Sequence, residues 1–99
     1  MTKKEAKESL LSDLRDQGVD YSDEGNIVEF EGLLVHFDTN YINVRYNSVS
    51  AHYPLSKLSY IAVMGGAFWV STIDAYEFTV IYFSQLLTPS YNQGKVRVD

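Results

Sequence analysis

Two histidines, an asparagine and an arginine are the side chains whose types and spacing best suit a chemical site. If the segments between residues 33 and 53 form a meander with two-residue turns, His36, Asn43 and His52 fall in one row across three strands, and Arg45 lies on the same face. Zinc would hold both imidazoles at about 2.0–2.1 Å, yet strands lie about 4.8 Å apart, which separates the two histidines by roughly 9–10 Å. The spacing therefore disfavours a metal site and predicts a polar face that bonds to water or contacts a ligand.

Nucleophilic and phosphate-binding chemistry lack the motifs that they require. None of the serines stands in the Gly-x-Ser-x-Gly context that exposes a nucleophile at a strand–turn–helix junction. The stretch VMGGAFW, residues 63–69, has two adjacent glycines but no following lysine, and a strand-like run replaces the helix that a phosphate loop leads into. Gly65-Gly66 instead predicts a hairpin turn, where positive φ angles are required. We expect a protein that is not an enzyme and that uses no cofactor and no metal.

Charge is distributed unevenly along the chain. The net charge is -5, and residues 8–38 hold nine acidic side chains against one basic side chain, Arg15. Only eight lysines and arginines are present and they form no patch, which argues against direct nucleic-acid binding. An acidic region attracts a partner with a basic surface. The candidate partner-binding residues are Asp13, Asp16, Asp20, Asp23, Glu24, Glu29 and Glu31.

In size, acidity, tyrosine content and lack of a catalytic signature, the chain is similar in type to small phage-encoded inhibitors, such as anti-CRISPR and other anti-defence proteins. The resemblance implies an inhibitor that docks on the nucleic-acid-binding surface of a protein partner. The alternative is a homo-oligomeric module that sequesters a small anionic ligand such as a nucleotide. Its candidate ligand face would be His36, Asn43, Arg45 and His52.

The expected location follows from what the sequence lacks. It contains no cysteine, no apolar signal-peptide region near its first residue, and no apolar stretch of the ~20 residues that a membrane span requires. We expect a cytoplasmic protein without a membrane segment, located in the host-cell cytoplasm if it is phage-encoded.

The elements that would position these side chains form one α+β domain over residues 1–99. Thr2 and Glu5 fit a capping box before an apolar stripe, so we expect an amphipathic helix over residues 3–17. Over residues 26–71 the apolar period changes to two, which predicts an antiparallel sheet. This sheet would contain a meander of about four strands and the Gly-Gly hairpin.

The end of the chain is expected to be helical and then polar. Over residues 72–87, apolar side chains recur at alternating steps of three and four, which predicts a C-terminal helix that Pro89 stops. Residues 90–99 are expected to form a polar tail, in which a short edge strand is one alternative.

The Gly-Gly hairpin is apolar on both faces. Pairing around the two glycines places Tyr60, Met64 and Trp69 on one face and Phe68 on the other. Exposed aromatic and methionine side chains are typical of association sites, so these four residues are a candidate apolar interface. The alternative is that the C-terminal helix covers one face and the meander covers the other. The sequence leaves both open.

Overall fold

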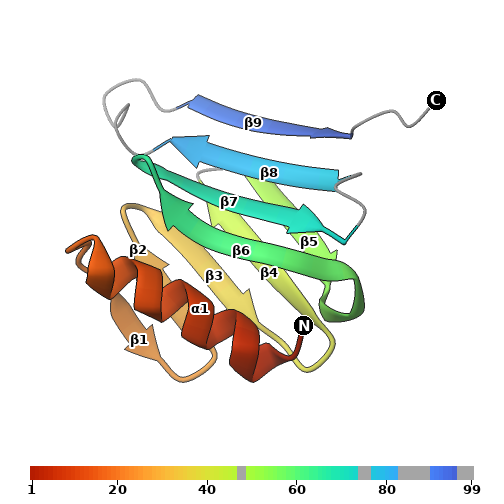
Figure 1. Ribbon diagram of the computed structural model, residues 1–99, viewed down its shortest axis with the longest axis horizontal. Helices are drawn as coiled ribbons and strands as arrows, with labels where there is room; N and C mark the ends of the chain where they lie inside the picture. Colours follow the sequence, from red (N-terminus) through yellow and green to blue (C-terminus); the bar gives the residue numbers. More distant parts are fainter. Residues whose placement is uncertain (47–48, 74–76, 83–89, 96–99) are drawn as a thin grey trace.

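The computed structural model describes residues 1–46, 49–73, 77–82 and 90–95, which form one long helix, a short 3-10 helix and two antiparallel sheets (Figure 1). The N-terminal helix and the antiparallel α+β architecture predicted from the sequence are confirmed, but the single sheet expected over residues 26–71 is wrong, because the meander and the Gly-Gly hairpin belong to different sheets. One sheet has five strands in the order β1-β2-β3-β4-β5, and the other has four in the order β6-β7-β8-β9. The elements in chain order are α1 (Lys3–Asp16), β1 (Ser22–Glu24), β2 (Ile27–Phe30), β3 (Leu33–Phe37), β4 (Tyr41–Tyr46), β5 (Val49–Pro54), η1 (Leu55–Lys57), β6 (Leu58–Met64), β7 (Ala67–Thr72), β8 (Glu77–Tyr82) and β9 (Ser90–Lys95).

Helix α1 begins at the predicted capping box. The Thr2 hydroxyl accepts from the Glu5 backbone N–H at 3.1 Å, and the Glu5 carboxylate accepts from the Thr2 backbone N–H at 3.0 Å. These bonds satisfy two of the N–H groups that a helix start leaves without a partner. They also lower the pKa of the Glu5 carboxyl, because the backbone N–H of Thr2 stabilises its ionised form. The apolar stripe of Ala6, Leu10 and Leu14 is fully buried, as its spacing predicts.

The five-stranded sheet has the predicted register from β3 to β5. Phe37 pairs with Ile42, Val35 with Val44, and Val44 with Ala51, so their side chains share the buried face. The two-residue turn at residues 39–40 preserves this alternation between β3 and β4, because the side-chain period of a strand is two. One strand was not predicted: Ser22–Glu24, which has turn-like composition, pairs with β2 and extends the sheet.

The two sheets pack face to face around one buried cluster that also includes α1 (Figure 1). The Phe30 ring from β2 contacts the Phe68 ring from β7 edge to face, with centroids 5.6 Å apart. A buried hydrogen bond of 2.6 Å joins the Tyr53 hydroxyl in β5 to the Thr79 hydroxyl in β8. Aromatic packing and a satisfied polar pair therefore fix how the two sheets sit on each other.

The predicted C-terminal helix is wrong over the described part of residues 72–87. Thr72 ends β7 and Glu77–Tyr82 form β8, while residues 74–76 and 83–87 lie outside the described residues. The helical spacing was coincidental, because a strand that is apolar on both faces matches many periodic templates. Strand pairing decides the outcome: β8 lies between β7 and β9 and buries Thr79, Val80 and Ile81.

The tail prediction is corrected in part. Residues 90–95 of the predicted polar tail form strand β9 at the edge of the four-stranded sheet. Residues 96–99, where the alternation of valine with basic residues suggested a strand, lie outside the described residues.

Helix α1 covers the open edge of β6. Three side chains one turn apart bond to the β6 backbone: the Ser9 hydroxyl donates to the Ile61 carbonyl at 3.0 Å, the Asp13 carboxylate accepts from the Val63 N–H at 3.0 Å, and the Gln17 amide donates to the Val63 carbonyl. A strand edge leaves such groups open to pairing with another chain. The helix thus takes the place of a further strand, and we call this contact the α1–β6 seam.

Candidate functional site

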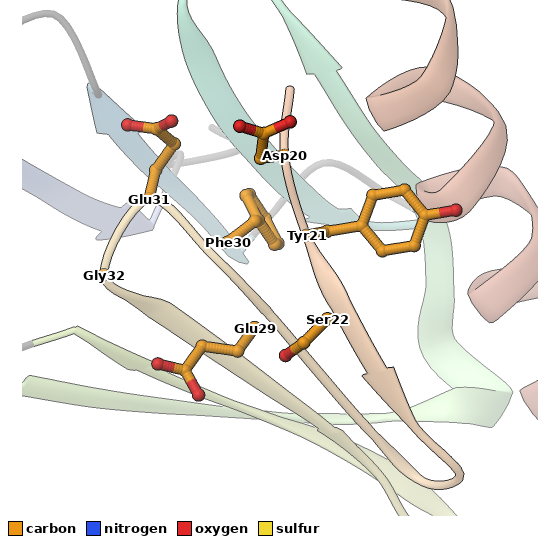
Figure 2. A pocket seen from close by; sticks show the side chains of 7 residues that line it. All are labelled: Asp20, Tyr21, Ser22, Glu29, Phe30, Glu31 and Gly32. Carbon is orange, nitrogen blue, oxygen red and sulfur yellow. The ribbon is translucent and has the colours of Figure 1, made fainter. Parts of the chain in front are cut away.

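Three carboxylates lie at the corner where β1, β2 and the β2–β3 turn come together (Figure 2). They surround a shallow, open depression of about 360 Å³. None of the described residues that line it is basic. We call this feature the acidic corner; its residues are Asp20, Tyr21, Ser22, Glu29, Phe30, Glu31 and Gly32.

The fold presents the carboxylates of this corner outward and turns its rings inward. Figure 2 shows Asp20 and Glu31 together at one end of the depression and Glu29 beside Ser22 at the other, while the Tyr21 ring points toward α1. Phe30 is buried in the core. The polar lining of the depression is therefore carboxylate and hydroxyl, which suits a cationic group such as a lysine or arginine side chain.

The turn that carries Glu31 has an unusual backbone. Glu31 has φ 49° and Gly32 has φ 77°, so both central residues of the two-residue turn are left-handed, as a type I′ hairpin requires. Glycine, asparagine and aspartate are the usual residues there, and a glutamate costs conformational energy. This turn places the Glu31 carboxylate at the corner at the expense of local strain.

The remaining predicted acidic residues do not all face solvent freely. Asp13 is half-buried and accepts the Val63 N–H in the α1–β6 seam. Asp23 forms an ion pair of 2.8 Å with Lys7, whose ammonium also donates to the Gly25 carbonyl at 2.6 Å. Asp16 and Glu24 are exposed, outside the residues that line the acidic corner. Of the seven predicted residues, the structure brings together Asp20, Glu29 and Glu31.

The predicted ligand face is the outer face of the five-stranded sheet. Cross-strand pairs join His36 to Asn43 and Asn43 to His52, as the register predicted, and Leu34 to Arg45. A smaller depression of about 180 Å³ lies over β2, β3 and β4. We call it the polar-face depression; it is lined by Ile27, Leu34, His36, Asn43 and Arg45.

His52 lies outside this depression and stacks on Tyr41. Their ring centroids are 4.1 Å apart, with planes tilted by 34°. Sequence reasoning missed Ile27 as a lining residue, although its alternation with Val28 along β2 places it on the outer face. Among the described residues, no group of three or more histidine, aspartate or glutamate side chains could hold a metal ion.

A short hydrogen-bonded cluster closes the β3–β4 turn beside this face. The Asp38 carboxylate accepts from the Thr39 backbone N–H at 2.7 Å, and this bond, together with one from the Tyr41 hydroxyl, lowers the pKa of the Asp38 carboxyl. The same hydrogen bond raises the pKa of the Tyr41 hydroxyl, because losing its proton would place two negative charges together.

The outer face of the Gly-Gly hairpin exposes part of the predicted apolar interface. Gly65 and Gly66 have φ 61° and 72°, and the predicted pairing around them is confirmed. Tyr60 is 40% and Met64 44% exposed, whereas Phe68 lies on the opposite face and is fully buried. Phe68 belongs to the core and is not available for an interface.

The outer hairpin side chains are held by contacts among themselves. The Trp69 indole N–H donates to the Met64 carbonyl at 3.1 Å, and the Tyr60 hydroxyl contacts the Met64 sulfur at 3.6 Å. These contacts reduce the freedom of the aromatic side chains on this face.

Comparison with known proteins finds no matching family, no similar curated protein and no similar solved structure. The described part of the chain contains no helix with the length and apolar character needed to cross a bilayer.

Proposed function

We propose that this protein is a small, non-enzymatic binding module whose acidic corner docks on a basic surface of a protein partner. The observation that carries the proposal is the convergence of Asp20, Glu29 and Glu31 on one open depression, without a basic side chain among its described lining residues. A lysine or arginine side chain of a partner can pair with these carboxylates through charge-assisted hydrogen bonds. Charge complementarity of this kind favours rapid encounter and selects partners by charge.

A nucleic-acid-binding groove is the partner surface that fits this corner best. Such grooves are lined by lysine and arginine side chains that normally contact phosphates. A protein whose carboxylates occupy the same side chains would compete with nucleic acid for them. The net charge of -5 adds a long-range attraction to such a groove and a repulsion toward nucleic acid itself. The proposed activity is therefore inhibition by occupation, without a chemical step.

The test compares two double variants that remove the same amount of charge. Asp20→Asn with Glu31→Gln neutralises two carboxylates of the acidic corner, and Glu8→Gln with Asp16→Asn neutralises two exposed carboxylates of α1. Binding to a fluorescein-labelled nona-arginine peptide is measured by anisotropy over a range of salt concentrations. Each ion pair at a surface contributes about 0.2–1 kcal/mol, so the corner variant should bind roughly 2–30-fold more weakly.

The control variant should bind more tightly than the corner variant at every salt concentration, and the difference should shrink as salt screens the charges. Equal weakening of both variants would show that only net charge attracts the peptide and would refute docking at the corner. A second readout tests inhibition directly. The unmodified protein should displace a labelled DNA duplex from the same peptide, and the corner variant should need a several-fold higher concentration.

A further inference from the structure

The polar-face depression combines hydrogen-bond donors that bind no other described residue with an apolar wall, on the sheet face that points away from the second sheet. Arg45 is exposed, and the Asn43 side chain is half-buried. Within the described chain, neither side chain has an ion pair or a hydrogen bond to another residue. His36 pairs with Asn43 across β3 and β4, and Arg45 stands two residues further along β4. Donors from three side chains therefore border one small hollow.

The other wall of the depression is aliphatic. Ile27 is 37% exposed, and Leu34 is half-buried beside it. The two belong to neighbouring strands and both line the hollow. An exposed aliphatic surface next to an unpaired guanidinium matches a ligand that carries both an anionic group and an apolar group.

Size and charge narrow the class of ligand. The volume of about 180 Å³ falls below the roughly 300–1,000 Å³ that holds a nucleotide or a drug-sized molecule. Glu29 pairs with Leu34 across β2 and β3, so a carboxylate lies next to the hollow. That negative charge opposes a doubly charged phosphate more strongly than a singly charged carboxylate. The depression thus favours a monoanion over the nucleotide that the sequence alone suggested.

We propose that the polar-face depression binds a carboxylate attached to a short aliphatic group. The Arg45 guanidinium pairs with the carboxylate, because its planar donors match the two oxygens, and Asn43 and His36 supply further N–H donors. The aliphatic group packs on Ile27 and Leu34. Two sources present this chemistry: a free small carboxylic acid, and the C-terminal residue of a peptide that ends in leucine. The site adjoins the acidic corner at Glu29 but shares no lining residue with it, and it does not depend on the function proposed for that corner.

The experiment is an NMR titration of the full chain, labelled with ¹⁵N, against matched pairs of probes. The probes are 4-methylpentanoate and its neutral amide, and the peptide acetyl-Gly-Gly-Leu with a free or an amidated C-terminus. We expect saturable shifts of the backbone amides at the five lining positions with both carboxylates, and at least about tenfold weaker binding of the amides, because a charge-assisted hydrogen bond is lost. Tighter binding of the peptide than of the free acid would assign the site to a peptide C-terminus, and the reverse order would assign it to a small acid.

Variants complete the test. Arg45→Gln should weaken binding of 4-methylpentanoate about tenfold, whereas Arg15→Gln removes an exposed charge from α1 and should leave it unchanged. Both substituted side chains are exposed, so the fold tolerates the changes, and unshifted amides elsewhere in the spectrum will verify this. Equal shifts with carboxylate and amide, an unchanged affinity of Arg45→Gln, or the same response to inorganic phosphate alone would each overturn the proposal.

Discussion

Replacing Asp13 with alanine should loosen the contact between α1 and the edge of β6. The Asp13 carboxylate accepts the Val63 backbone N–H at 3.0 Å in a half-buried position. Hydrogen bonds to charged groups contribute about 1.5–3 kcal/mol, and removing the acceptor also leaves the N–H without its partner. Because water can reach this half-exposed site, we expect the lower part of that range, about 1.5–2 kcal/mol.

Asp16→Ala is the matched control for this substitution. Asp16 lies in the same last turn of α1 and is exposed, so both variants lose an unfavourable negative charge near the helix C-terminus and gain the helix propensity of alanine. Only Asp13→Ala removes a bond to β6. The difference between the two variants therefore measures the Asp13–Val63 hydrogen bond, and Asp16→Ala itself should stay within about 0.5 kcal/mol of the unmodified protein.

Urea unfolding followed by circular dichroism measures the difference. The urea midpoint of Asp13→Ala should fall while the m-value stays unchanged. In thermal unfolding, each kcal/mol lost should lower the melting temperature by about 4–8 °C for a domain of this size. Asp13→Asn keeps an acceptor oxygen and should fall between alanine and the unmodified protein. If Asp13→Ala unfolds within 0.5 kcal/mol of Asp16→Ala, the hydrogen bond from Asp13 to Val63 contributes nothing measurable and the role given to Asp13 is refuted.

Three further predictions concern the strained turn, the contact between the sheets and the acid response. Glu31→Asn should raise the free energy of unfolding by about 0.5–1 kcal/mol, measured in urea, because asparagine adopts the left-handed conformation more readily; an unchanged midpoint would contradict strain at Glu31. Tyr53→Phe should lower the free energy of unfolding by about 1–2 kcal/mol, since it removes the buried hydroxyl that bonds to Thr79. When Tyr53→Phe is made in a protein that already carries Thr79→Val, it should cost clearly less, because the partner hydroxyl is already absent. The pKa of Asp38 is lowered in the folded protein, so its contribution is present above the unfolded pKa of about 3.9 and is lost as pH falls through the folded value. The free energy of unfolding, measured between pH 2 and pH 6, should therefore change less with pH in Asp38→Asn than in the unmodified protein. The same pH dependence in both proteins would argue against this hydrogen bond.

The sheet register was predictable because two constraints acted together. Apolar side chains alternate along β3, β4 and β5, and the two-residue turns expected from the sequence keep the alternation in phase from one strand to the next. The helix start was predictable for a local reason as well, since the capping box needs only residues three apart. Local rules of this kind do not depend on the rest of the fold.

The segment that became β8 shows where such rules fail. Val80 and Ile81 are both buried although they are neighbours in one strand, which means that both faces of β8 are covered. A pattern without a polar face carries no period that could separate a strand from a buried helix. The decision came from pairing with β7 and β9, and those contacts cannot be read from the segment itself.

The candidate sites were predictable in composition but not in detail. The row of His36, Asn43 and His52 follows from the register, yet the depression beside it depends on Ile27 from β2. The count of carboxylates likewise identified an acidic region, but it did not distinguish the exposed carboxylates from those that bond to other parts of the chain. No local sequence pattern indicates that Asp13 would bond to a backbone N–H fifty residues away.

Helix α1 shows why the acidic residues of this protein do not all form one exposed acidic surface. Its apolar stripe enters the core through Leu10, its polar stripe bonds to the β6 edge through Asp13, and its outer stripe exposes Glu8 and Asp16. A charge reversal at Asp13 would therefore open the seam as well as change the surface, and reduced binding could arise from either effect. Neutralising Asp20 and Glu31 alters the acidic corner without touching that seam. A test of docking at the corner must therefore change only carboxylates that make no contact needed for stability, so that weaker binding cannot be caused by a loosened fold.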